Sequence, residues 1–129
     1  MRYLGIDFGE KNVGLAISDP LLKMGLPLTV LRNSNDLVDE ISTICKENNI
    51  NIIVVGESKN YSGGENEIMK QIRPFVQKLE EKTGLEVKLH PEFLTSFQAE
   101  KIQGKTPMHD ASAAAIILTS FLETHARTS

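Results

Sequence analysis

The chain has 129 residues, a formal net charge of −3, and a composition that is 40% hydrophobic and 24% charged. This length predicts a single domain, residues 1–129, and the composition is that of a soluble globular protein rather than a disordered or fibrous one. The negative charge argues against a histone-like coat on nucleic acid, but it leaves a nuclease open because carboxylates that bind metal count as negative.

Neither a membrane segment nor a secretory signal is expected. No apolar run reaches the roughly 20 residues of a membrane-spanning helix, and Met1–Tyr3 lead directly into a strand-like run. The single cysteine, Cys45, excludes an internal disulfide and falls on the apolar face of an expected helix, so it is a poor candidate for a nucleophile. We therefore expect a cytoplasmic protein.

The first half of the chain predicts strands followed by a helix and a further strand. Three strand-like runs come first, the first two joined as a hairpin: residues 2–9, 12–18 and 26–32. Residues 34–49 then have helical periodicity, with Ser34 or Asn35 as the expected N-cap and Asn48-Asn49 at the end. The β-branched run "INIIVVGE", residues 50–57, is typical of a parallel strand buried on both faces.

The second half predicts helices that alternate with one more strand. Residues 65–82 carry a helical stripe in which Pro74 should introduce a kink, and Thr83-Gly84 ends it. The remaining elements are a strand, a short helix, a polar loop and an alanine-rich helix: residues 85–92, 94–102, 103–108 and 109–125. His90, inside the expected strand, is interpreted as a core residue or a wall of the cleft rather than a ligand.

The order β-β-β-α-β-α-β-α predicts an α/β fold with a five-stranded mixed sheet flanked by helices. Right-handed crossovers place the first strand at the centre, with the fourth and fifth strands parallel to it on one side. Open α/β sheets bind ligands at the carboxyl ends of their parallel strands. Those ends carry Asp7, Glu57 and Glu92.

Three carboxylates from distant parts of the chain are the main candidates for a metal site: Asp7, Glu92 and Asp110. Asp7 is costly to bury in a strand unless a positive charge compensates it. Asp110 begins the last helix, and the alanines that follow would let this helix approach the sheet closely. Oxygen ligands of this kind suit Mg²⁺ or Mn²⁺, and paired ions can activate a water for phosphodiester cleavage. The alternatives are that Asp110 only complements the helix dipole and that Glu92 is solvated.

Four blocks of the sequence, in this order and spacing, resemble the YqgF (RuvX) family: "LGIDFGEKNVGLAIS", "IIVVGESKNYSGGENE", "VKLHPEFLTSFQAE" and "HDASAAAIIL". The resemblance covers essentially the whole chain. It implies a ribonuclease H-like fold related to the RuvC Holliday-junction resolvases. It also implies a divalent-metal nuclease whose acidic ligands match Asp7, Glu92 and Asp110.

The chain departs from the family pattern at two blocks. The fifth-strand block usually reads Asp-Glu-Arg-Leu-Thr/Ser, whereas this chain has Pro91-Glu92-Phe93-Leu94-Thr95, so that one acid and one base are missing. After the fourth strand the family tends to read Gly-Leu-Pro, whereas this chain has Gly56-Glu57-Ser58. Glu57 stands where RuvC-like enzymes have a carboxylate, which makes it a candidate ligand; the alternative is a solvated strand end.

Six polar residues are candidates for contacts with nucleic acid, the alternative for each being an incidental surface position: Lys11, Asn12, Lys59, Lys101, Lys105 and His109. The resemblance implies a nuclease that matures the 5′ end of pre-16S rRNA in ribosome biogenesis, or alternatively a resolvase of branched DNA. A nucleic-acid-binding module with weak catalysis is a third interpretation. Because the opening hairpin also resembles the phosphate-binding hairpin of the actin, sugar-kinase and Hsp70 ATPases, an ATP-binding half-domain is a fourth. We expect a monomer or weak homodimer.

Overall fold

Five strands form one mixed sheet in the computed structural model, which describes residues 1–58, 68–92 and 109–126. The strands are β1 (Tyr3–Phe8), β2 (Asn12–Ser18), β3 (Gly25–Arg32), β4 (Ile52–Ser58) and β5 (Glu86–Glu92). Their order across the sheet is β3-β2-β1-β4-β5, with β1 antiparallel to β2 and parallel to β4. This confirms the predicted topology, in which the first strand is central and the fourth and fifth strands lie on one side of it.

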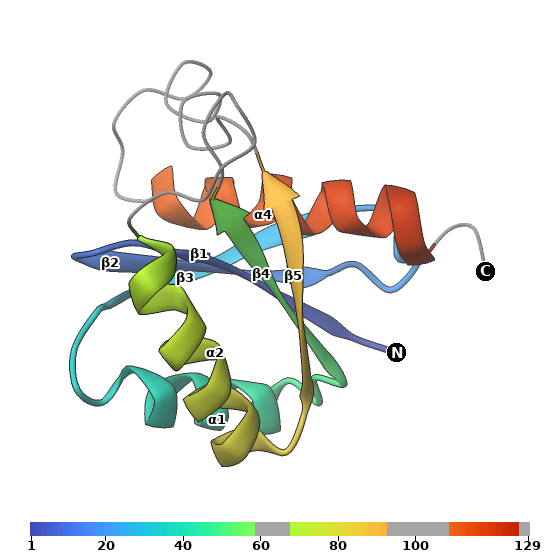
Figure 1. Cartoon of the computed structure of the whole chain (residues 1–129). Helices are drawn as coiled ribbons and strands as arrows, with labels where there is room; N and C mark the ends of the chain where they lie inside the picture. The colour runs from blue at the N-terminus through green and yellow to red at the C-terminus, as the bar shows by residue number, and fades with distance from the viewer. Residues whose placement is uncertain (59–67, 93–108, 127–129) are drawn as a thin grey trace.

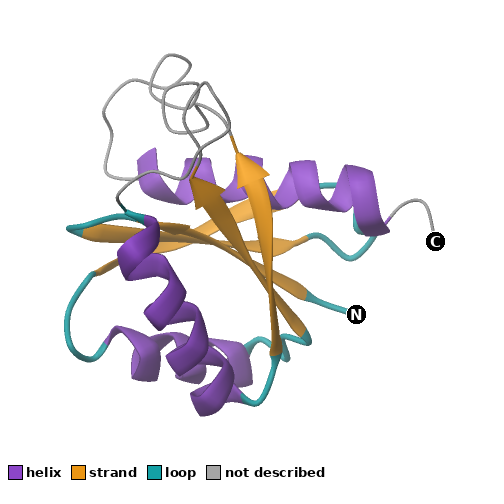
Figure 2. Cartoon of the chain, viewed as in Figure 1, coloured by secondary structure: helices purple, strands orange, loops and turns teal. Residues whose placement is uncertain are grey.

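Helices cover both faces of this sheet (Figures 1 and 2). Helices α1 (Leu37–Glu47) and α2 (Met69–Thr83) pack together on one face, and α4 (His109–Phe121) crosses the other. A π-helical segment, η1 (Leu122–Ala126), completes the helix that was predicted for residues 109–125. The helix and the loop predicted for residues 94–108 lie outside the described residues. In the part of the chain that the structure describes, no helix is both long and apolar enough to cross a membrane.

Strand β1 separates the two hydrophobic clusters of the molecule because its side chains alternate between the faces. Leu4 and Ile6 are fully buried in the larger cluster, which α1 and α2 cover, and Phe8 packs against the same cluster. Tyr3 belongs to the smaller cluster beneath α4, where its ring lies 5.7 Å from that of Phe121. By the same alternation, Asp7 lies on the face that α4 covers.

The start of α1 differs from the prediction. The N-cap residue is Asp36, whose side chain makes no capping hydrogen bond. Ser34 instead accepts a hydrogen bond from the Asp36 N–H at its Oγ and one from the Leu37 N–H at its carbonyl oxygen, at 3.2 Å each. The expected N-cap at Ser34 or Asn35 is therefore wrong, because these residues form a turn that precedes the helix.

The ends of the helices agree with the predicted stop signals. Helix α1 ends at Glu47 with Asn48 as its C-cap, and α2 ends before Gly84, whose φ of 71° is the left-handed conformation that glycine adopts readily. Helix α2 continues through Pro74 as one element. Its described part begins at Met69, so that the predicted start at residue 65 lies outside the described residues.

Candidate functional site

The carboxyl ends of β1, β4 and β5 meet at one edge of the sheet. Ile6 of β1 pairs with Val55 of β4, so Asp7, the next residue, is level with Gly56. Glu57 pairs with Pro91, and Ser58 pairs with Glu92. The parallel register thus brings the backbone of Asp7, Glu57 and Glu92 to the same edge, as the topology predicted.

Within this edge, Asp7 and Glu57 belong to opposite faces of the sheet. Gly56 faces α4, because a Cβ on it would lie 2.6 Å from the Cδ1 atom of Ile117, whereas Val55 is part of the cluster under α1 and α2. Alternation along β4 therefore assigns Glu57 to the face of α1 and α2. Both carboxylates are half-buried, and both take part in polar interactions.

Helix α4 runs antiparallel to β1 and lies very close to it (Figure 1). A Cβ on Gly5 would lie 2.8 Å from the Cβ of Leu118 and 3.1 Å from the carbonyl oxygen of Ala114, so only glycine allows this approach. Ala111, Ala113 and Ala114 have no exposed surface, which confirms that the alanine-rich helix packs closely on the sheet.

This contact shows in which direction from Gly5 the first turn of α4 lies. Asp110 precedes Ala114 by four residues, which is one helical turn and about 6 Å along the axis. Asp7 follows Gly5 by two residues, which is about 6.6 Å along the strand. Because helix and strand run in opposite directions, both steps lead towards the carboxyl edge of the sheet, so the first turn of α4 lies on the same side of this contact as Asp7. The side chains of Glu92, His109 and Asp110 are not among those that the structure describes.

The turn that follows Asp7 is held by Asn33, a residue that no sequence motif indicated. The Asn33 side chain donates a 2.8 Å hydrogen bond to the carbonyl oxygen of Gly9, and its backbone N–H donates a 2.9 Å bond to that of Lys11. A Cβ on Gly9 would lie 2.5 Å from the Asn12 carbonyl oxygen. The turn is therefore tightly constrained, and the one available signal was an asparagine directly after a strand.

Only some of the candidate nucleic-acid contacts lie among the residues that the structure describes. Lys11 and Asn12 are exposed at the turn beside Asp7, where they are accessible to a ligand at the carboxyl edge. Lys59, Lys101 and Lys105 lie outside the described residues. His90 is buried, its Nε2 is 2.9 Å from the Oγ of Ser120, and its ring packs edge-on against Phe121. These contacts confirm His90 as a core residue.

A divalent metal ion fits the chemistry of this edge, because its candidate ligands are carboxylate oxygens. Among the side chains that the structure describes, no three histidines, cysteines, aspartates or glutamates form a group that could hold a metal ion. The complete set of candidate ligands includes Glu92 and Asp110, so it extends beyond those side chains. The described residues include Asp7 on the central strand and the part of α4 that packs closely on β1.

The sheet order, the helices on both faces and the acidic carboxyl edge define the ribonuclease H-like class of α/β folds, to which the RuvC resolvases belong. RuvC of Thermus thermophilus, solved in complex with Holliday junction substrate, matches with a TM-score of 0.65 and 20% sequence identity. The match covers 100% of this chain and 96% of that chain. At this identity the likeness establishes the fold.

Sequence comparison identifies the family. The family model RuvX, described as Holliday junction resolvase, matches residues 1–124. A Dictyoglomus turgidum protein named "Putative pre-16S rRNA nuclease" is 33% identical over 133 residues, which cover 95% of this chain and 94% of the relative. The chain belongs to the RuvX family, as the four sequence blocks predicted.

The fold is also similar to part of a sugar kinase. A ROK hexokinase of Thermus thermophilus matches with a TM-score of 0.50 and 19% identity, and the match covers 83% of this chain but 39% of the kinase. This likeness concerns the fold alone.

Proposed function

We propose that this protein is a divalent-metal-dependent endonuclease that processes the 5′ end of pre-16S rRNA. Membership of the RuvX family and the names of its relatives support a nuclease. The observation that carries the proposal is the contact of Gly5 with Ala114 and Leu118, because it packs α4, the helix whose first turn contains Asp110, directly on the strand that carries Asp7.

In this proposal Asp7, Glu92 and Asp110 hold Mg²⁺ or Mn²⁺. Glu57, which lies on the face of the sheet opposite to Asp7, is a further candidate ligand. A divalent ion bound there would make an attacking water more acidic and stabilise the leaving oxygen of the phosphodiester. Lys11 and Asn12, exposed at the turn after Asp7, bind a phosphate of the substrate. Lys59, Lys101, Lys105 and His109 are proposed to contact the nucleic acid as well.

The working form of the enzyme in this proposal is a cytoplasmic monomer or weak homodimer that binds nucleic acid and no membrane. A symmetric cut across a four-way junction would call for two active sites, and hence for a dimer. Cleavage of a single RNA strand needs one. The oligomeric state during turnover therefore bears directly on the substrate.

A direct test incubates the purified protein and Mn²⁺ with a labelled pre-rRNA leader and, separately, with a synthetic four-way junction. The Asp7→Asn variant serves as the inactive control. Glu10→Gln serves as the matched control, because Glu10 is an exposed carboxylate only three residues away. We expect cleavage of the leader by the wild type and by Glu10→Gln, and none by Asp7→Asn.

Resolution of branched DNA is the second candidate function. It is favoured by the description of the matching family model as Holliday junction resolvase and by the fold of RuvC. Paired, symmetric cuts in the junction, with the leader left intact, would support this function over the first. Binding of either substrate without cleavage in Mn²⁺ would support a binding module. Stabilisation by ATP without nuclease activity would support the nucleotide-binding half-domain.

A further inference from the structure

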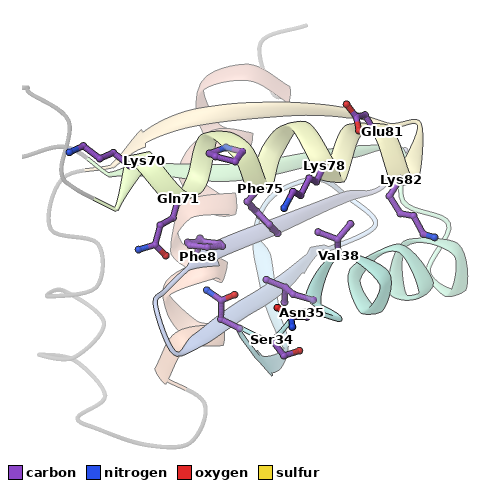
Figure 3. A pocket seen from close by; sticks show the side chains of 13 residues that line it. Phe8, Ser34, Asn35, Val38, Lys70, Gln71, Phe75, Lys78, Glu81 and Lys82 are labelled. Atoms are coloured by element: carbon purple, nitrogen blue, oxygen red, sulfur yellow. The ribbon is translucent and has the colours of Figure 1, made fainter.

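A groove of about 820 Å³ lies on the opposite face of β1 from Asp7, between α1 and α2 (Figure 3). One side is formed by α2 and the other by the start of α1 and the residues before it, Asn33–Asn35. Phe8, at the end of β1, lies at the floor. Because Phe8 directly follows Asp7, the groove begins one residue from the proposed catalytic edge.

The floor of the groove is aromatic. The rings of Phe8 and Phe75 lie with their centroids 4.8 Å apart and tilted by 43°, and both side chains line the groove. Phe75 is buried, with 6% of its surface exposed, whereas Phe8 is only half-buried. A partly exposed aromatic ring is the kind of surface on which an unpaired base stacks, and this stacking is tolerant of base identity.

The rim of the groove is basic, although the chain as a whole carries a net charge of −3. Among the residues that the structure describes, its charged lining residues are three lysines of α2, Lys70, Lys78 and Lys82, and one acid, Glu81. Lys82 pairs with Asp39 of α1 at 3.3 Å, and both groups are well exposed, so this pair is worth little and can exchange partners. Lys70 and Lys82 are separated by twelve residues, or about 18 Å of helix. The lysines therefore follow the length of the groove.

Polar side chains that can hydrogen-bond to bases line both sides of the groove. Ser34 and Asn35 are exposed on the α1 side, and Gln71 is exposed on α2 (Figure 3). A basic rim, an aromatic floor and exposed amide and hydroxyl groups together match a single nucleic-acid strand. In a duplex the base faces are stacked within the helix, so a duplex would leave the floor unused.

We propose that the groove between α1 and α2 binds a single-stranded segment of the RNA that flanks the scissile bond. The proposal deepens the function proposed above and rests on it, because Phe8 of the groove directly follows Asp7 on β1, although the two side chains lie on opposite faces of the sheet. The lysines of α2 bind backbone phosphates, and the ring of Phe8 stacks on an unpaired base. Substrates with an unpaired flank are thereby bound more tightly than substrates that end at the cut.

The first experiment measures binding of a labelled single-stranded RNA oligonucleotide to the whole chain by fluorescence anisotropy over a range of salt concentrations. Lys70→Gln/Lys78→Gln removes two charges from the groove. Lys23→Gln/Lys46→Gln is the matched control, because these lysines are exposed and do not line the groove. We expect the groove variant to bind about tenfold more weakly, with a salt dependence of log K shallower by about 1.4, since each lost phosphate contact in a single strand removes about 0.7. Unchanged affinity and slope would overturn the proposal.

The second experiment tests the aromatic floor and the requirement for a single strand. Phe8→Leu keeps the apolar packing but removes the ring, and we expect it to weaken RNA binding several-fold with an unchanged salt slope. An equal loss of affinity in Lys70→Gln/Lys78→Gln for a blunt RNA duplex and for the single strand would contradict the choice of a single strand. Thermal melting of each variant verifies that it is folded.

The third experiment tests whether binding in the groove contributes to cleavage of the RNA. With the wild type, removal of the unpaired flank from the RNA should raise KM about tenfold. The groove variant should show the same rise with the flanked RNA, and removing the flank as well should raise KM no further. Additive effects would overturn the proposal. If no RNA is cleaved by the wild type, the proposed function fails, while the binding measurements still decide whether the groove takes a single strand.

Discussion

Gly5 and Ala114 lie in direct contact across the interface of β1 and α4, where a Cβ on Gly5 would lie 3.1 Å from the Ala114 carbonyl oxygen. The same Cβ would lie 2.8 Å from the Cβ of Leu118, which cannot move without its helix. We therefore expect Gly5→Ala to lower the free energy of unfolding by about 1–3 kcal/mol, as overpacking does. Since α4 must move outward, we also expect loss of nuclease activity. Urea unfolding and RNA cleavage measure the two effects.

Gly56→Ala provides the matched comparison. A Cβ there meets the Cδ1 atom of Ile117 at 2.6 Å, which is the flexible end of a side chain. The cost should be smaller than for Gly5→Ala. Ile117→Val removes the obstructing methyl group, so the double variant Gly56→Ala/Ile117→Val should be more stable than the sum of the single changes predicts. Wild-type stability of Gly5→Ala would show that α4 does not press on β1.

Asp7→Asn tests the carboxylate on the central strand. We expect it to abolish cleavage and to leave the melting temperature of the metal-free protein equal or higher, because removal of one charge relieves repulsion among the carboxylates at this edge. Glu10→Gln should retain both activity and stability. Melting curves with EDTA and cleavage assays with Mn²⁺ measure the two quantities. Full activity of Asp7→Asn would refute the proposed mechanism.

Asn33→Ala tests the turn that follows Asp7. The change removes the 2.8 Å hydrogen bond to the Gly9 carbonyl oxygen but keeps the backbone bond to Lys11. We expect a loss of about 1 kcal/mol of stability and a lower cleavage rate, because the turn beside the proposed site becomes looser. Asn35→Ala, two residues further along and exposed, should change stability by less than about 0.5 kcal/mol. Equal losses in both variants would mean that the Gly9 bond contributes nothing.

The buried thiol of Cys45 should make the protein less stable at alkaline pH. Burial raises the pKa of the Cys45 thiol to about 11 from an ordinary value of 9.0, and 4% of the residue's surface is exposed. In the unfolded chain the thiol ionises at the lower pH. The stability that the buried, neutral thiol contributes to the fold is therefore fully present below pH 9 and is lost as pH rises towards 11. The wild type should therefore lose on the order of 2 kcal/mol more than Cys45→Ala over this interval.

Chemical denaturation at a series of pH values measures this difference. The native thiol should also react slowly with a thiol reagent at pH 8 and rapidly once the chain is unfolded. If stability depended on pH in the same way in the wild type and in Cys45→Ala, the raised pKa of the buried thiol would be contradicted. Cys45→Ala should retain cleavage activity, because Cys45 lies on α1 within the core and takes no part in the proposed site.

The topology could be predicted because its signals are local or follow from chain connectivity. The apolar run at residues 50–57, the stop at Gly84 and the two crossovers suffice to place β1 at the centre. The face of Glu57 could not be predicted, because it depends on the register of β4 against its neighbours. The role of Asn33 was also missed, since its hydrogen bond to Gly9 spans 24 residues of sequence. The groove is likewise formed by residues that meet only through the packing of α1 on α2.

Asp7 and Phe8 occupy successive positions of one strand and belong to opposite faces of the sheet. An insertion or deletion of a single residue within β1 would exchange these faces for every side chain beyond it. The carboxylate would then enter the aliphatic core and the aromatic ring would lie beneath α4, so that the metal site and the RNA groove would be lost together. The length of β1 should therefore be invariant during the evolution of this protein, whereas the identities of its aliphatic residues remain free to vary.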